Sequence, residues 1–248
     1  MLRIIAFVLT IGVLLSMLTS CYDADEVTDI AYVMFIGIDE GISDKWRLTF
    51  QVPAMTEQGG GSQSGEGESG STPKFKSLTL DAPSFFAGIE LANTIIPRRL
   101  NLMHTQFLVF SEELAKSGKI GEFIAPIIRY REIRHSVNVL ISRGKAEEFV
   151  KVFEPYIGGT ISRTVEDFLQ MPKQTGFFNN LTLYDLYDCI KSTYHQPISV
   201  LGAINEGENF IEEGEKWGDK YTITADYYAG DIPRKEGNEI ELLGVAVF

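Results

Sequence analysis

The fold is decided first by residues 30–52, which read IAYVMFIGIDEGISDKWRLTFQV. Their first part, Ile30–Ile38, is an apolar run rich in β-branched and aromatic residues, and Asp39-Glu40-Gly41 closes it. This pattern predicts a strand buried on both faces, followed by a turn. Apolar residues at 46, 48, 50 and 52 then alternate with Arg47, Thr49 and Gln51. The alternation predicts a half-exposed strand that pairs with the first as a hairpin.

Strand and helix patterns continue through the next hundred residues. A strand is expected at 74–80, and a helix at 85–96 with Asp81 and Pro83 as start signals and Pro97 as its stop. A buried strand at 104–110 follows this crossover helix, and Ser111 caps a short helix at 112–116. Further patterns predict a helix at 120–128 containing Pro126, a strand at 137–141 and a helix at 145–153. Together they predict a mixed α+β fold, with a mixed β-sheet and packed helices.

The second part of the chain begins at a predicted joint, Gly158-Gly159. Helices are expected at 165–169 and 182–192, and strands at 198–204, 221–228 and 239–248. The predicted organisation is therefore a leader at 1–20, a mixed-sheet domain at 21–157 and a smaller α+β region at 158–248. The apolar strand pattern runs to the last residue, Phe248, which predicts that the second region is incomplete at its C-terminus.

Composition narrows the function classes. The 248 residues carry a net charge of −12 with 44% hydrophobic residues, as expected for a folded protein. Because phosphate neutralisation needs an excess of Lys and Arg, this charge argues against nucleic acid as a partner. The Gly/Ser-rich tract 57–72 is predicted to be a flexible loop. Its Glu57, Glu66 and Glu68 and the lack of a G-K-[ST] motif argue against phosphate binding there.

The N-terminus has the pattern of a secretory signal peptide. Arg3 is its only charge before Asp23, and residues 4–18 are almost wholly apolar. As a helix these 15 residues would span roughly 22 Å, less than a hydrocarbon core of about 30 Å. The following Leu18-Thr19-Ser20-Cys21 resembles the bacterial lipobox, in which cleavage precedes a cysteine that receives diacylglycerol. A generic signal peptide or short membrane anchor with a chance cysteine is the alternative.

Cys21 is accordingly predicted to be the lipid attachment site of a lipoprotein. Removal of residues 1–20 leaves 21 basic against 34 acidic residues, a net charge of −13. Since no segment is polybasic, attachment to headgroups by charge is not expected, and acyl chains would hold the protein. In a Gram-positive bacterium the domain would then face outward from the cytoplasmic membrane. The other thiol, Cys189, lies in a helical pattern and is expected to be a small buried hydrophobe.

Chemistry-bearing patterns are sparse. The three histidines, His104, His135 and His195, are too far apart in sequence for a helical zinc pair. Ser111 lacks the glycines of a nucleophile elbow. We therefore expect no enzyme activity, no catalytic residue, no metal and no cofactor. One basic pair, Arg98 and Arg99 after Pro97, is a candidate contact for an acidic partner; its alternative is a solvated pair that complements a helix dipole.

Several segments together resemble the Ger(x)C family, the lipoprotein C subunits of bacterial spore germinant receptors. The lipobox is followed by Gly37-Ile38-Asp39-Glu40-Gly41, similar to the family's G-I-D-x-G, and by the strand 46–52. The resemblance continues through these further segments: Pro97-Arg98-Arg99-Leu100, His104-Thr105-Gln106, 111–116, Ile133-Arg134 and Gly144-Lys145-Ala146. It covers roughly residues 18–160, and the order of the motifs is more specific than any one of them.

The sequence departs from the family in two places. The tract 57–72 is longer than the family's connection, and the family's chain continues through a further C-terminal domain where this one stops at Phe248.

The resemblance implies a subunit that works in assembly or signalling with a membrane A subunit and a nutrient-sensing B subunit. It also implies a location on the outer face of the spore inner membrane. Two alternatives from other classes are a solute-binding lipoprotein that captures a small ligand between two lobes, and an envelope hydrolase.

Overall fold

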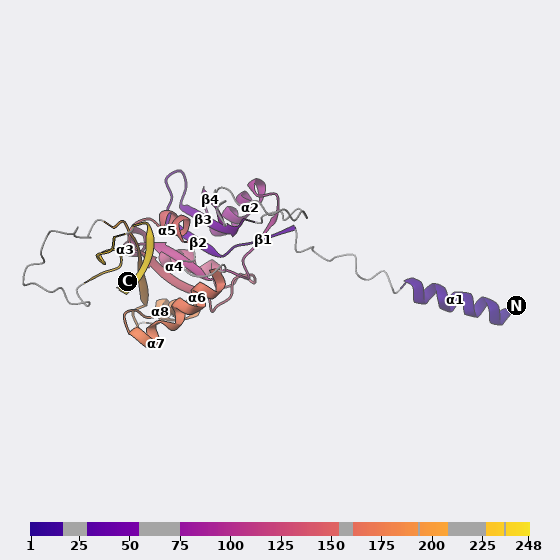
Figure 1. Ribbon diagram of the computed structural model, residues 1–248. Coiled ribbons are helices and arrows are strands. Elements are labelled where there is room, and N and C mark those ends of the chain that lie inside the picture. Colours follow the sequence, from indigo (N-terminus) through magenta and orange to yellow (C-terminus); the bar gives the residue numbers. More distant parts are fainter. Residues whose placement is uncertain (17–28, 55–74, 154–160, 193, 208–226, 236) are drawn as a thin grey trace, which may run out of the picture. The chain divides into compact units, whose positions relative to one another are not determined.

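The computed structural model describes residues 1–16, 29–54, 75–153, 161–192, 194–207, 227–235 and 237–248 (Figure 1). The predicted loop 57–72, Cys21, the joint Gly158-Gly159 and nearly all of the predicted strand 221–228 lie outside these residues. The N-terminal helix α1 (Leu2–Ser16) belongs to a separate unit, Met1–Ile30, whereas Ala31–Phe248 form one compact unit. Among the described helices, none has both the length and the apolar character needed to cross a membrane.

The compact unit alternates strands and helices, as the sequence predicts. In chain order its elements are β1 (Ile30–Tyr32), β2 (Phe35–Glu40), β3 (Trp46–Pro53), β4 (Phe75–Ala82), α2 (Phe85–Ile95), β5 (Arg99–Asn101), β6 (Phe107–Ser111), α3 (Glu112–Lys116), α4 (Ile120–Ile127), β7 (Asn138–Ser142), α5 (Ala146–Val152), α6 (Ile161–Gln170), α7 (Pro172–Thr175), β8 (Leu181–Thr182), α8 (Leu183–Lys191), β9 (Ile198–Asn205) and β10 (Glu239–Val247).

One mixed sheet organises the unit, with strand order β10-β9-β7-β6-β2-β3-β4 and the short β8 beside β7. Its central strands β2, β6, β7 and β9 are parallel, and antiparallel strands continue the sheet on both sides. Parallel strands need crossover connections, and helices α2 to α8 supply them. The mixed α+β class predicted from the sequence is confirmed.

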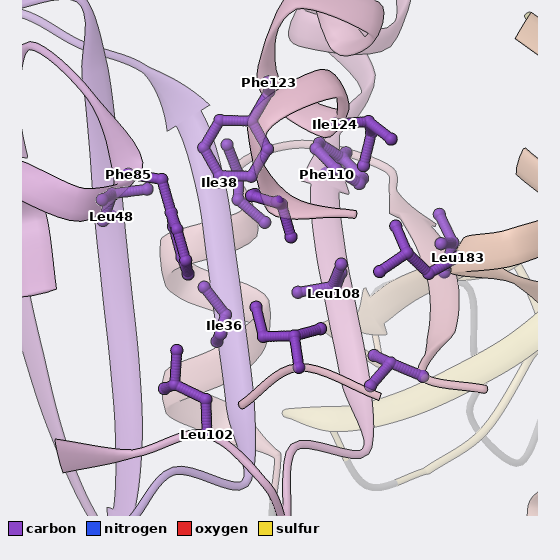
Figure 2. Close-up of a cluster of buried hydrophobic side chains, with 14 of the residues drawn as sticks. Ile36, Ile38, Leu48, Phe85, Leu102, Leu108, Phe110, Phe123, Ile124 and Leu183 are labelled. Carbon is purple, nitrogen blue, oxygen red and sulfur yellow. The ribbon is translucent and has the colours of Figure 1, made fainter. Parts of the chain in front are cut away.

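Helices cover both faces of the sheet, and each face has its own core. On one face, Ile36, Ile38, Leu108 and Phe110 pack against α2, α4 and α8 (Figure 2). Phe123 of α4 lies at the centre of this core, with its ring 5.2 Å from that of Trp46 and 5.7 Å from those of Phe85 and Phe110.

On the other face, Phe35, Phe107 and Val109 pack against α5 and α6. The alternation of side chains along β2 therefore divides this strand between two cores. Burial on both faces, predicted for Ile30–Ile38, is confirmed for its Phe35–Ile38 part.

The prediction of one continuous strand over Ile30–Ile38 is wrong. The chain forms β1, which pairs with β5 in a separate two-stranded sheet, and enters the main sheet only at Phe35. At the break, the Val33 N–H donates to the Asn101 carbonyl and the Met34 N–H donates to the Gln51 carbonyl. The sequence pattern does not reveal this change of partner, because both segments are apolar.

The prediction that β3 is half exposed is also wrong. Thr49 is 0% and Gln51 1% exposed, because α5 covers the polar side of this strand. Asp81, taken as a helix start signal, instead lies inside β4, and Ser84 is the N-cap of α2. The predicted hairpin of β2 and β3 is confirmed, as is the Ser111 cap, whose hydroxyl accepts from the Leu114 N–H at 3.3 Å.

The sheet extends across the predicted boundary at 157/158. β7 pairs with both β8 and β9, and β10 continues the sheet beyond β9. That boundary therefore does not correspond to a break in the sheet. Among the residues described, one continuous layer of strands joins the two predicted regions.

Candidate functional site

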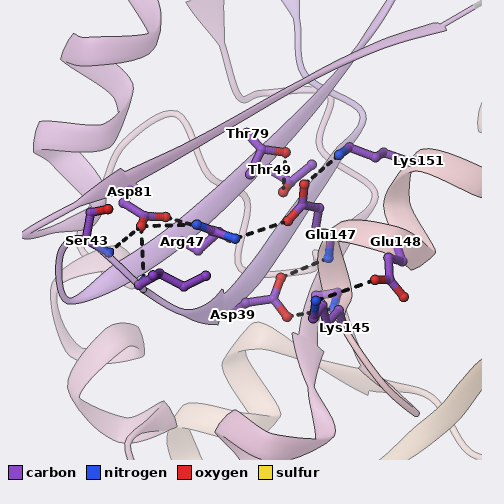
Figure 3. A network of polar contacts seen from close by, with 12 residues as sticks. Asp39, Ser43, Arg47, Thr49, Thr79, Asp81, Lys145, Glu147, Glu148 and Lys151 are labelled. Carbon is purple, nitrogen blue, oxygen red and sulfur yellow. Dashed lines mark hydrogen bonds and ion pairs between the residues drawn. The ribbon is translucent and has the colours of Figure 1, made fainter.

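A polar network occupies the otherwise apolar space between the sheet and α5 (Figure 3). We call it the α5 network and define it by Asp39, Arg47, Asp81, Glu147 and Lys151. Three of these residues form one row across neighbouring strands, because Asp39 of β2 is opposite Arg47 of β3, which is opposite Asp81 of β4. Strand register therefore places alternating charges side by side.

Asp39 holds the start of α5. Its two carboxylate oxygens accept from the Ala146 and Glu147 backbone N–H groups, both at 2.8 Å. These N–H groups belong to the first turn of the helix, where intrahelical acceptors are lacking. Asp39 is only 6% exposed, and this burial raises its pKa above the usual value, although the two N–H groups and the Ser111 hydroxyl oppose the shift. The arrangement is a helix cap supplied by a distant strand.

Arg47 and Asp81 make a two-pronged ion pair beside Asp39. The Arg47 Nε lies 2.7 Å from Asp81 Oδ1, and its Nη2 lies 3.2 Å from Oδ2. Asp81 Oδ2 also accepts from the Ile42 and Ser43 N–H groups, which ties β4 to the β2–β3 turn. The guanidinium is the main cause that lowers the pKa of Asp81 to about 2.

Glu147 connects the ion pair to the helix. Its carboxylate lies 3.6 Å from Arg47 Nη1 and 2.5 Å from the Lys151 ammonium one turn along α5. Lys151 is the main cause that lowers the pKa of Glu147, and Arg47 adds to it. The network thus joins three strands to one helix through ion pairs between opposite charges.

The other end of α5 is held by Gln51. Its side-chain nitrogen donates to the Val150 carbonyl at 2.7 Å and to the Phe153 carbonyl at 3.2 Å, groups at the end of the helix. Side chains of β2 and β3 therefore hold both ends of this seven-residue helix. A helix so short is marginal by itself, so its position depends on these contacts.

The segments that carry the family resemblance meet here. Gly37 lets α5 approach the sheet, because a Cβ at this position would lie 3.1 Å from the Ala146 carbonyl oxygen. Asp39 and Gly37 come from G-I-D-x-G, Arg47 from the following strand and Ala146 from Gly144-Lys145-Ala146. The sequence pattern places Asp39 at a turn, whereas it lies in β2. The sequence signal for its role is a charged residue inside a motif that is otherwise typical of a strand.

Arg98 and Arg99, the predicted partner contact, are not part of the α5 network. They follow α2, and Arg99 is the first residue of β5. The Arg99 guanidinium is 3.0 Å from the Glu132 carboxylate, and 59% of the Arg99 side chain is exposed. Arg99 therefore has an intramolecular contact, and a partner contact at this pair stays a prediction. Cys21, the predicted lipid site, lies outside the described residues.

The three histidines lie in separate environments. The His104 ring is edge-on to Tyr32 at 4.7 Å, and His135 Nε2 lies 2.9 Å from the Ile128 carbonyl oxygen, while His195 is exposed. Within the described ranges, no group of three His, Cys, Asp or Glu side chains is arranged to hold a metal ion. Cys189 is half-buried on α8, and burial raises the pKa of its thiol.

Comparison with known proteins assigns this domain. Residues 23–202 match the family model described as "Spore germination protein N-terminal domain", which covers most of the chain. The chain therefore contains the N-terminal domain of a spore germination protein. The chain belongs to the Ger(x)C family, as its motifs indicate.

Two relatives from Bacillus subtilis (strain 168) support this assignment. YfkR, a protein assigned to spore germination, is 30% identical over an alignment of 141 residues that covers 54% of this chain. Spore germination protein KC is 28% identical over 139 residues, or 56% of this chain. In both cases the match spans 34% of the relative's length, so the chain corresponds to about a third of these proteins. No solved structure matches the chain.

Proposed function

We propose that this chain is the membrane-anchored lipoprotein subunit of a spore germinant receptor. Membership of the spore germination family establishes the wider role, which is in spore germination. The finer role would be assembly or signalling with membrane A and B subunits, on the outer face of the spore inner membrane. The family match over residues 23–202 carries this proposal, because it begins two residues after the lipobox cysteine.

The anchor is proposed at Cys21. The α1 helix Leu2–Ser16 has 15 residues and would supply the apolar part of a signal peptide, and Leu18-Thr19-Ser20-Cys21 follows it after Met17. Stable attachment needs two or more acyl chains, as diacylglycerol and an N-terminal acyl group would provide.

A role without turnover is part of the proposal. Asp39 and Glu241 are the buried carboxylates among the residues described. Asp39 already accepts hydrogen bonds from two backbone N–H groups of α5. Glu241, 7% exposed on β10, accepts likewise from the Asn205 amide and the Gly230 N–H. Both groups are engaged in holding the fold, which supports a binding or signalling subunit.

Intact-mass measurement tests the anchor. The full-length chain is expressed in a Gram-positive host, extracted from membranes and compared with a Cys21→Ala variant. We expect the wild-type mass to equal residues 21–248 plus diacylglycerol, with or without an N-acyl group. Cys21→Ala should be uncleaved or released from the membrane, while Cys189→Ala should be processed as wild type. An unmodified Cys21 in the membrane-extracted protein contradicts the proposal.

A further inference from the structure

Five arginines gather at one place on this acidic protein. They are half of the ten arginines in the chain, and we call them the arginine patch: Arg98, Arg99, Arg129, Arg131 and Arg134. Two precede or begin β5, and three lie in the connection between α4 and β7. The two groups are far apart in the sequence, so the patch forms only in the folded chain.

Specific contacts bring the two segments together. The ion pair between Arg99 and Glu132 joins β5 to the α4–β7 connection at 3.0 Å. Tyr130 of the same connection packs on α2, because its ring lies 5.2 Å from that of Phe86. The connection itself is compact, because the Tyr130 N–H donates to the Ile127 carbonyl and the Ile133 N–H donates to that of Tyr130. The patch is therefore part of the packed unit.

The three arginines of the α4–β7 connection are exposed to solvent. Arg129, Arg131 and Arg134 are exposed, and none of the three forms a salt bridge within the part of the chain that the structure describes. Arg129, Arg131 and Arg134 thus place three exposed positive charges within six residues of a chain whose net charge is −12.

The patch lies beside the point where the chain enters the compact unit. β1 is the first strand of the domain, and its sheet partner is β5, which begins at Arg99. Ile30, where β1 starts, is nine residues after Cys21. An extended chain of that length reaches at most about 30 Å, so an acyl group on Cys21 would keep this side of the domain close to the bilayer.

We propose that the arginine patch contacts anionic phospholipid headgroups and fixes the orientation of the anchored domain on the membrane; this rests on the proposed lipid anchor at Cys21. Each arginine near an anionic surface favours contact about fivefold at moderate ionic strength. The acyl chains provide attachment, and the patch selects which side of an otherwise acidic domain faces the lipid. No attraction to headgroups was expected from the sequence, because no single segment is polybasic. The fold, however, brings together arginines from two segments.

The test measures how close the patch comes to lipid. A fluorophore is attached at Ser136→Cys, an exposed position two residues after Arg134, in a Cys189→Ser background. The lipidated full-length product is reconstituted into vesicles of phosphatidylcholine alone or with 30% phosphatidylglycerol, each containing a headgroup-labelled nitroxide lipid. We expect several-fold stronger quenching on the anionic vesicles, and we expect 0.5 M NaCl to remove the difference.

Two triple variants isolate the patch. Arg129→Gln/Arg131→Gln/Arg134→Gln should reduce quenching on anionic vesicles to the level of neutral ones. Lys116→Gln/Lys145→Gln/Lys173→Gln removes the same charge from exposed positions elsewhere and should leave quenching unchanged. A protein that leaves the vesicles altogether, or whose Cys21 takes up the fluorophore, shows failure of the anchor.

If the chain stays attached and quenching is equal on both vesicle types, the proposed anchor still stands and the proposal for the arginine patch is wrong. Loss of receptor subunits from spores in the arginine variant, without any lipid-dependent quenching, overturns it in favour of an acidic protein partner.

Discussion

At the scale of single residues, two aspartates on the same side of the sheet have opposite pKa shifts. Asp39 and Asp81 flank Arg47 in one cross-strand row. Burial raises the pKa of Asp39, whereas the Arg47 guanidinium lowers that of Asp81 to about 2. The difference arises because Arg47 directs its hydrogen bonds to Asp81, while Asp39 accepts from the backbone of α5.

The low pKa of Asp81 predicts a pH-dependent contribution to stability. A carboxylate whose pKa is lower in the folded state stabilises the fold above its unfolded value of 3.8, and this contribution is lost as the pH falls through about 2. Asp81→Asn should therefore lower the free energy of unfolding by about 1 kcal/mol at pH 7, since the pair is partly solvent-screened. Denaturant unfolding at several pH values measures this. The deficit should shrink between pH 4 and pH 2.

The matched control for Asp81 is Asp167→Asn, which removes an exposed carboxylate from α6. We expect it to change the unfolding free energy by less than about 0.5 kcal/mol at each pH. A deficit in Asp81→Asn that is the same at pH 7 and near pH 2 would show that the ion pair with Arg47 does not stabilise the fold.

At the scale of elements, the contacts of α5 require that the helix lies close to the sheet. Gly37 allows this close approach, because a Cβ there would lie 3.1 Å from the Ala146 carbonyl oxygen and 3.2 Å from a Val150 methyl carbon. Gly37→Ala should force α5 outward and weaken the bonds of Asp39 to the first turn. We expect a loss of about 1–3 kcal/mol in unfolding free energy and faster hydrogen exchange in α5.

Gly121→Ala is the control for Gly37→Ala. It adds the same methyl group to α4, where the nearest atom would be an Ile190 methyl carbon at 3.6 Å, an ordinary contact. Because alanine favours helix over glycine, the control should be neutral or slightly more stable. Unchanged stability and unchanged α5 exchange in Gly37→Ala would contradict the close approach.

Elements with a clear local signal were predictable from the sequence, and those set by tertiary contacts were not. The alternation in β3 correctly predicted a strand, but burial of Thr49 and Gln51 depends on α5, which follows about a hundred residues later. The apolar run 30–38 predicted strand character and missed the change of sheet at Val33.

Among the candidate site residues, motif order identified the family, but only the fold shows that Asp39, Arg47 and Ala146 come together. Three arginines within residues 129–134 were a visible signal that sequence analysis did not use.

At the scale of the whole molecule, one sheet joins the parts that the sequence predicted as separate regions. Ala31–Phe248 form a single compact unit, and β9 and β10 extend the sheet begun by β2. The proposed anchor and the arginine patch would both act where the chain enters this unit.

The central claim is that this chain is a subunit of a germinant receptor, and isolation of the receptor from spores tests it most directly. An affinity-tagged full-length chain is purified from detergent-extracted spore inner membranes, and co-purified proteins are identified by mass spectrometry. The account predicts recovery of the A and B subunits with the tagged chain, and their loss when Cys21→Ala prevents anchoring. Recovery of a membrane-anchored, lipidated chain without either subunit would contradict it.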